Sequence, residues 1–68
     1  MKNALIKLER KQHADDESTW YLVGYYADGD EMVWGNYRMT KPGSRRMLTV
    51  YANRMNFRIV GNVAEPKN

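Results

Sequence analysis

The chain contains no cysteine, and this absence excludes two supports that small domains often use. Disulfide bonds and thiolate zinc sites both require cysteine side chains. A chain of 68 residues buries only about 60% of its unfolded surface, so one small hydrophobic core must stabilise it. A cysteine-free composition is also compatible with a reducing compartment, and we expect a cytoplasmic location.

Long hydrophobic runs are absent as well. A membrane-spanning helix needs about 20 mostly apolar residues, whereas charged residues interrupt the N-terminal segment MKNALIKLERK. The same charges exclude the apolar core of a signal peptide, and we expect no membrane partner. The final segment, AEPKN, has no apolar residue beyond Ala64. The sequence therefore predicts one compact domain over residues 1–63 and a flexible C-terminal tail over residues 64–68.

Residue patterns that support chemistry are scarce. His13 is the only histidine and lies in the acidic run QHADDES of residues 12–18, where a nucleophile would lack a firmly held base. This run also lacks the alternating ligands and the glycine of a calcium loop, and the ligand spacing of a zinc site. We predict no catalytic residue, no metal site, no cofactor and no enzymatic activity, with residues 12–18 forming a mobile polar loop.

The strongest local signal is a β-hairpin over residues 20–37, WYLVGYYADGDEMVWGNY. An Asp-Gly pair such as Asp28-Gly29 favours a two-residue type I′ turn, and both flanks are rich in aromatic and β-branched residues. A two-residue loop would place Tyr25 opposite Met32 and Val23 opposite Trp34. Alternation of side chains then predicts one face with Trp20, Leu22, Val33 and Tyr37, and another with Tyr21, Val23, Tyr25, Met32 and Trp34. Both predicted faces are apolar.

Three further elements complete the predicted fold. Residues 3–11 alternate apolar and charged side chains, which indicates a half-buried strand, and we place it at a sheet edge. Residues 44–55 show helical spacing, with Ser44 as N-cap and Asn56 as left-handed C-cap; a pair of strands within residues 44–60 is the alternative. Residues 57–63 read as a strand. The sequence predicts an α+β domain in which one helix packs on a small antiparallel sheet of three to four strands, in the order β-β-β-α-β.

Charge is distributed unevenly along the chain. The charged side chains of residues 1–31 sum to −3 and those of residues 32–68 to +6. Such an asymmetry indicates a polyanion or an acidic protein surface as partner, unless the fold interleaves the two halves and the charges cancel. The segment KPGSRR at residues 41–46 adds a local signal, because arginines beside a helix N-terminus can bind an anion.

One helix cannot cover both apolar faces of the hairpin. The uncovered face must curl into a barrel, pair with a second copy or remain exposed, and exposed Tyr and Trp beside Arg suit a protein-binding hot spot or a platform for nucleobases. We expect the helix over Trp20, Leu22, Val33 and Tyr37, although the reverse assignment stays open. The predicted partner-binding residues are Tyr21, Tyr25, Trp34, Arg38, Lys41, Arg45, Arg46 and Arg54.

The cysteine-free 68-residue chain, its charge asymmetry and the WYLVGYY–EMVWGNY hairpin beside KPGSRR resemble small phage-encoded proteins that bind and redirect a host enzyme, among them inhibitors of bacterial RNA polymerase. The resemblance implies a regulatory protein that binds and inhibits or redirects a larger host protein, such as RNA polymerase, in the host cytoplasm. Two alternatives stay open: a nucleic-acid-binding domain that uses a basic helix and an aromatic hairpin, and a homo-oligomer whose hairpin face is the interface.

Overall fold

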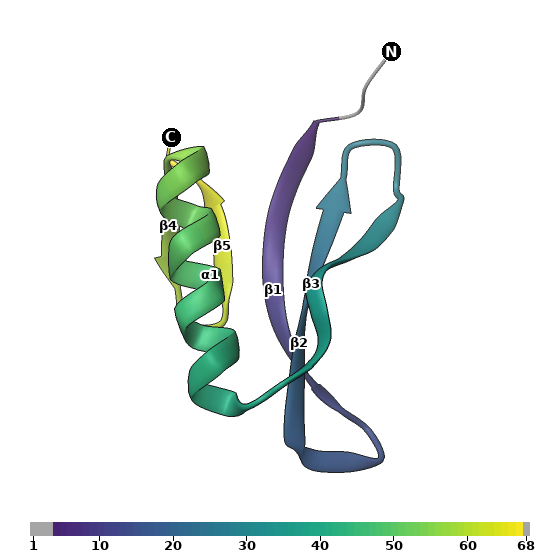
Figure 1. Cartoon of the computed structure of the whole chain (residues 1–68). Coiled ribbons are helices and arrows are strands. Elements are labelled where there is room, and N and C mark those ends of the chain that lie inside the picture. Colours follow the sequence, from purple (N-terminus) through teal and green to yellow (C-terminus); the bar gives the residue numbers. More distant parts are fainter. Residues whose placement is uncertain (1–3, 68) are drawn as a thin grey trace.

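The computed structural model describes residues 4–67 and shows a five-stranded antiparallel sheet with one helix across one of its faces (Figure 1). The elements in chain order are β1 (Leu5–His13), β2 (Asp16–Tyr26), β3 (Glu31–Met39), α1 (Lys41–Met55), β4 (Phe57–Val60) and β5 (Val63–Pro66). The expected α+β class and single helix are confirmed. The expected count of three to four strands is wrong, because the order is β-β-β-α-β-β.

The extra strand lies at the C-terminal end. We expected one strand over residues 57–63 and a flexible tail over residues 64–68, whereas a turn with Gly61 at φ 62° separates β4 from β5. Ala64 of β5 is fully buried beneath the helix layer, so Val63–Pro66 belong to the sheet. Residues 1–3 of the expected domain and Asn68 of the expected tail lie outside the described residues.

β1 is the central strand and not the expected edge strand. The strand order is β3-β2-β1-β5-β4, so β1 pairs with β2 on one side and with β5 on the other. Its alternation reflects the two environments of the sheet: Leu8 and Arg10 are buried on the helix side, while Lys7 and Glu9 lie on the other face. A strand with one apolar face therefore indicates a sheet that is covered on one side only.

The expected loop of residues 12–18 is a tight turn. β1 continues to His13 and β2 begins at Asp16, which leaves only Ala14 and Asp15 between them. The Asp16 carboxylate organises the start of β2, because it accepts hydrogen bonds from the backbone N–H and the hydroxyl of Ser18 and from the hydroxyl of Thr19. The polar composition of this segment therefore serves the turn itself.

The β2–β3 hairpin forms as expected, with a different loop length. Tyr26 N donates to Asp30 O, and Gly29 N donates to Tyr26 O with Gly29 at φ 93°. The loop therefore contains three residues with glycine in the left-handed position, a common alternative to the two-residue turn. The pairs become Leu22 opposite Trp34 and Val23 opposite Val33.

This change of one residue in the register moves every β3 side chain to the other face. Trp34 lies on the helix side with Leu22, while Val33 and Tyr37 lie on the uncovered side with Tyr21. The expected assignment of these three β3 residues was therefore reversed, and so was that of Met32, which lies opposite Gly24 on the helix side. The β2 residues were assigned to the correct faces. A register shift between positions 20 and 22 of β2 then leaves Trp20 opposite Met39.

α1 confirms the predicted helix and excludes the alternative of two strands there. It begins earlier than expected, since Thr40 is the N-cap and accepts a hydrogen bond from Gly43 N, and Pro42 occupies the first turn. Asn56 ends the helix in the left-handed conformation, as predicted. The buried positions Ser44, Leu48 and Ala52 are spaced by four, which is the stripe of a helix packed on one side.

The core contains Leu8, Leu22, Leu48, Ala52 and Ala64, and the buried side chain of Arg10 joins it to the start of α1. Arg10 donates hydrogen bonds to Ser44 Oγ at 3.0 Å, Lys41 O at 3.1 Å and Asn62 Oδ1 at 2.8 Å, and its guanidinium lies 4.7 Å from the Trp20 ring centroid. These contacts connect β1, α1 and the β4–β5 turn through one side chain. Burial, followed by the charge of Arg45, lowers the pKa of the Arg10 guanidinium from its ordinary value.

Candidate partner-binding surfaces

The sheet presents one face away from α1, which we call the open face. Residues of β1, β2 and β3 alternate onto it in register, with Lys7 opposite Tyr25, Lys11 opposite Tyr21 and Val23 opposite Val33. The open face consists of Lys7, Glu9, Lys11, Tyr21, Val23, Tyr25, Glu31, Val33, Tyr37, Arg58, Val60, Val63 and Glu65. Figure 1 shows α1 on the opposite side of the same sheet.

An aromatic cluster of His13, Tyr21 and Tyr37 occupies one end of the open face. The three ring centroids lie 4.4 to 5.0 Å apart, and His13 and Tyr37 meet edge to face. His13 is buried, and its Nε2 is hydrogen-bonded to Tyr37 O at 2.7 Å. Tyr37 is still 51% exposed, so the cluster holds a large aromatic surface in a fixed orientation for contact with a partner.

A shallow pocket of about 250 Å³ lies beside this cluster. Its walls are Lys11, Tyr21, Val23, Glu31, Met32, Val33 and Tyr37. Val33 is 40% exposed, which is high for an apolar side chain in a strand, and Met32 borders the pocket at the edge strand β3 although its position alternates to the other face. The pocket can therefore accept an apolar side chain, while Lys11 and Glu31 at its margin can bind polar groups.

Charges on the open face are balanced. Lys7 Nζ and Lys11 Nζ lie 4.8 and 5.8 Å from the Tyr25 ring centroid, and the pKa of the Lys11 ammonium is raised, with hydrogen bonding to Tyr25 as the largest cause. Glu9 and Glu31 lie on the same face. Arg58 and Glu65 form a salt bridge with each other at 2.9 Å, so their charges also cancel.

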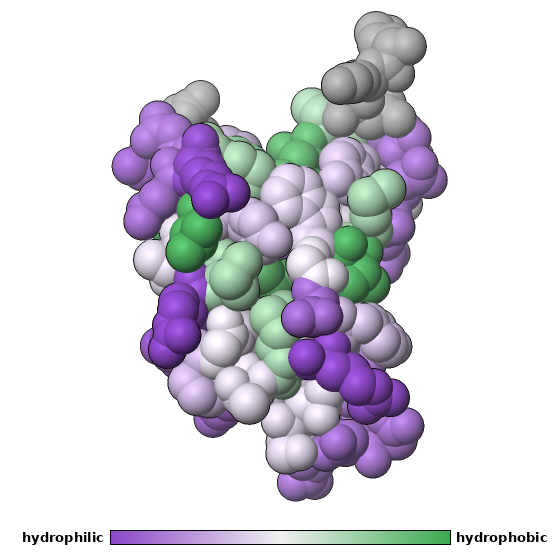
Figure 2. Space-filling model, in the orientation of Figure 1, coloured by the Kyte–Doolittle hydropathy of each residue, from purple (hydrophilic) through white to green (hydrophobic). Residues whose placement is uncertain are grey.

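The outer face of α1 has a different character. The helix contains Lys41, Arg45, Arg46 and Arg54 and no acidic residue, so all eight carboxylate side chains of the chain lie outside it. Figure 2 shows hydrophilic side chains along the edge of the molecule that α1 occupies. The expected charge asymmetry is therefore partly retained in space as a basic helix layer.

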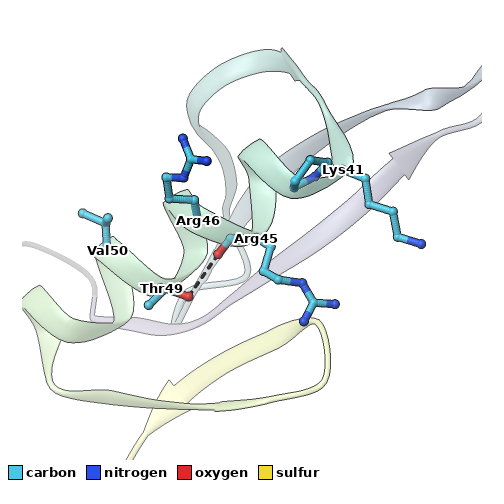
Figure 3. A pocket seen from close by; sticks show the side chains of 6 residues that line it. Lys41, Arg45, Arg46, Thr49 and Val50 are labelled. Carbon is cyan, nitrogen blue, oxygen red and sulfur yellow. Dashed lines mark hydrogen bonds between the residues drawn. The ribbon is translucent and has the colours of Figure 1, made fainter.

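A groove of about 540 Å³ runs along this outer face. Its lining residues are Lys41, Pro42, Arg45, Arg46, Thr49 and Val50 (Figure 3). Arg45 and Arg46 lie in the second turn of α1, one turn later than the sequence predicted. Thr40 already accepts a hydrogen bond from Gly43 N, and Pro42 has no N–H, so the helix terminus offers fewer donors to an anion than expected.

The structure distributes the predicted site residues over the two layers. Tyr21 and Tyr25 lie on the open face, whereas Lys41, Arg45, Arg46 and Arg54 lie on α1. Arg38 is exposed near the end of β3, where its charge is a minor cause of the lowered pKa of Asp16. Trp34 lies between the sheet and α1: its Nε1 donates to Tyr26 Oη at 3.0 Å, and its ring meets Tyr51 edge to face at 5.2 Å.

A comparison with protein-family models, curated proteins and solved structures found no match for this chain. Within residues 4–67, no helix is long and apolar enough to cross a bilayer. The same part of the chain holds no group of three or more His, Asp or Glu side chains arranged to bind a metal ion. The function must therefore be argued from the two surfaces.

Sequence reasoning missed several residues of the open face. Val33 and Tyr37 were assigned to the helix side because a two-residue loop was expected. Lys7 and Lys11 belong to the charged positions of the strand predicted over residues 3–11, but the edge position predicted for that strand did not place them beside the tyrosines. The signal present in the sequence was a strand with lysines on one face, followed in the chain by a strand with tyrosines at alternate positions.

Proposed function

We propose that the protein is a non-enzymatic binding protein that docks its open face onto a larger protein. The observation that carries the proposal is the uncovered apolar and aromatic surface around Tyr21, Val33 and Tyr37, which no described element of this chain covers. Tyrosine supplies rigid contact area at a low cost in side-chain entropy, and such residues concentrate binding energy at interfaces.

The size of the surface is consistent with this role. A standard protein–protein interface takes about 800 Å² from each partner, and the whole chain exposes 4780 Å². One side of a two-layer domain can therefore supply a full interface. The aromatic cluster and the shallow pocket would form its centre, and the charged pairs around them would form a polar rim.

The charge of the open face favours a protein over a nucleic acid. A platform for single-stranded nucleic acid combines stacked aromatic rings with an excess of positive charge along the backbone path. Here Glu9 and Glu31 offset Lys7 and Lys11. Mixed charges around an apolar centre match the composition of a protein interface.

The resemblance to phage-encoded regulators makes bacterial RNA polymerase the first target to test. In this proposal the protein acts in the host cytoplasm, binds the polymerase stoichiometrically and regulates transcription without a chemical step. The fold contributes a rigid presentation of the tyrosines, since the His13–Tyr37 hydrogen bond fixes the bulged part of β3.

A titration of purified RNA polymerase tests this proposal. We expect a one-to-one complex in which Tyr21→Ala and Tyr37→Ala together weaken binding at least about 30-fold, since each interface anchor contributes about 1–2 kcal/mol. Lys67→Gln, an exposed position outside the open face and the outer face of α1, is the control and should leave the affinity unchanged.

Two results would overturn the proposal. Unchanged affinity of the tyrosine variant, with its circular dichroism spectrum preserved, would remove the open face as the interface. A free protein that light scattering shows to be a dimer, and that the same tyrosine substitutions make monomeric, would assign the open face to a second copy of this chain.

The alternative of a nucleic-acid-binding domain receives support from one observation, the helix with four cations and no acidic residue. The aromatic open face and the basic helix lie on opposite layers, however, so one bound strand cannot use both surfaces as that alternative requires. Binding of DNA or RNA at about 50 mM salt, with an affinity that falls linearly as log salt increases, would favour the alternative.

A further inference from the structure

The four cations on the outer face of α1 have no carboxylate partner among the described residues. The salt bridge recorded for residues 4–67 joins Arg58 to Glu65 on the other layer. The outer face of α1 consists of Lys41, Pro42, Arg45, Arg46, Thr49, Val50, Asn53 and Arg54. Buried Arg10 contacts Ser44 of the same helix and is paired with hydroxyl, amide and carbonyl oxygens only. This side of the molecule therefore carries an uncompensated positive charge.

The groove on this face is a space between two ridges of the helix. One ridge follows Lys41, Arg45 and Thr49 and the other follows Pro42, Arg46 and Val50, each with a spacing of four residues. Ridges of this spacing are the features that interdigitate when two helices pack. The groove is therefore shaped to accept the side-chain ridge of another helix.

The lining of the groove combines apolar and cationic parts. Pro42, Val50 and the methylene groups of the arginines form apolar walls, while the charged ends of Arg45 and Arg46 point to different sides of α1 (Figure 3). The hydroxyl hydrogen of Thr49 is already used within α1, because it is donated to Arg45 O at 3.1 Å. An occupant must therefore present apolar side chains along its centre and negative charges on both flanks.

An acidic helix meets this description better than a nucleic acid does. Phosphate backbones bind rows of cations and gain little from an apolar groove, and stacking needs aromatic rings, which are absent from the groove lining. A helix with an apolar i, i+4 stripe between carboxylates supplies both required features.

We propose that the outer face of α1 binds an acidic amphipathic helix of a partner protein. The apolar ridge of that helix lies in the groove of residues 41–50, and its flanking carboxylates pair with Lys41, Arg45, Arg46 and Arg54. This inference goes beyond the function proposed above, because it concerns the opposite layer and does not require the open face. The protein would then have two independent docking surfaces.

Fluorescence anisotropy with a designed probe tests this inference on the full chain. The probe is a fluorescein-labelled 18-residue helical peptide with leucines spaced by four and flanked by glutamates. We expect saturable binding that Arg45→Glu with Arg46→Glu weakens at least about tenfold, because two attractive pairs become repulsive. Val50→Glu should weaken binding by a similar factor without changing the cations.

Matched controls identify the cause of any loss of peptide affinity. Lys7→Glu with Lys11→Glu makes the same change of net charge on the open face and should leave peptide affinity within about twofold. A peptide of identical composition with its leucines scattered around the helix should bind at least about fivefold more weakly. Circular dichroism of each variant confirms that the chain is folded.

Three outcomes would overturn the inference. The first is the absence of binding at protein concentrations up to about 1 mM. The second is equal binding of the peptide with scattered leucines. The third is tighter binding of a 20-nucleotide thymidine oligomer that the same arginine substitutions abolish, which would assign the surface to nucleic acid. Loss of polymerase binding by the tyrosine variants would not affect any of these readouts, so the two proposals can fail separately.

Discussion

At Gly24, the absence of a side chain lets the indole ring of Trp34 lie against the backbone of β2. A Cβ atom at this position would come within 2.4 Å of Trp34 Nε1 and 3.0 Å of Leu5 Cδ1. The indole cannot move away cheaply, because its Nε1 is bonded to Tyr26 Oη and its ring contacts Tyr51. Gly24 therefore fixes how β3 packs beneath the helix layer.

We predict that Gly24→Ala lowers the free energy of unfolding by about 1–3 kcal/mol, the usual cost of overpacking. Urea denaturation followed by circular dichroism measures this change. In a Trp34→Val background the added methyl group has space, so the same substitution should cost at least about 1 kcal/mol less. Equal costs in both backgrounds would show that the indole is not the obstacle.

The Asp16 carboxyl makes the stability of the folded protein depend on pH in the acid range. Hydrogen bonds from the Ser18 and Thr19 hydroxyls and the Ser18 backbone N–H lower the pKa of this carboxyl from 3.8 to about 2. A lowered pKa in the folded state means that the contribution to stability is complete above about pH 4. The contribution is then lost as the pH falls towards 2.

We predict that Asp16→Asn flattens the stability profile between pH 4 and pH 2, the interval set by these two pKa values. Thermal unfolding at a series of pH values measures the slope. Asp15→Asn, one position earlier in the same turn, is the control and should keep the wild-type slope. An unchanged slope in Asp16→Asn would contradict the assignment.

At the scale of elements, the start of α1 depends on Thr40. Its side chain accepts a hydrogen bond from Gly43 N at 3.0 Å, and its backbone carbonyl accepts one from Ser44 N at 2.9 Å. This cap positions the first turn, from which Lys41 O and Ser44 Oγ accept the hydrogen bonds of Arg10. The cap therefore also supports the connection between α1 and β1.

Thr40→Ala should lower the free energy of unfolding by about 0.5–2 kcal/mol, as for other N-caps, and Thr40→Ser should be nearly neutral. Thermal or urea unfolding with far-UV circular dichroism provides the measurement. If both substitutions cost the same, the methyl group of Thr40 rather than its hydroxyl would be the stabilising part.

The β2–β3 hairpin shows what sequence could and could not establish about an element. Its existence followed from Asp28-Gly29 between two aromatic segments, whereas its loop length did not, because glycine serves both two-residue and three-residue hairpin loops. The alternation of apolar and polar residues along two strands usually determines the register in which they pair. Here both faces of the hairpin are apolar, so either register leaves apolar residues beneath the helix.

At the scale of the whole molecule, strand order was the feature that sequence could not supply. The four residues of β5 carry few strand signals of their own, yet their pairing with Leu8 and Glu9 places β1 in the centre of the sheet. Such pairing is non-local and is decided by the packing of the complete domain. The helix, its C-cap and the α+β class depend on local signals and were predicted correctly.

The sequence identified which residue types would form the candidate site, but not how these residues are arranged on the surface of the domain. Tyrosines of β2 and arginines of α1 were identified from composition and spacing. Their separation onto opposite layers depends on the register of β3 and on the side of the sheet that α1 covers. Both are properties of the folded domain, and together they replace one composite site by an aromatic open face and a basic helix face.

The most direct test of the open face as the partner-binding surface is hydroxyl-radical footprinting of the protein alone and in complex with RNA polymerase. We predict that modification of Tyr37 and Val33, which are 51% and 40% exposed in the free chain, falls severalfold in the complex. Ile59, which is 42% exposed and lies on the helix side of the edge strand β4, should keep its reactivity. Protection of Ile59 with unchanged modification of Tyr37 and Val33 would contradict the open face as the partner-binding surface.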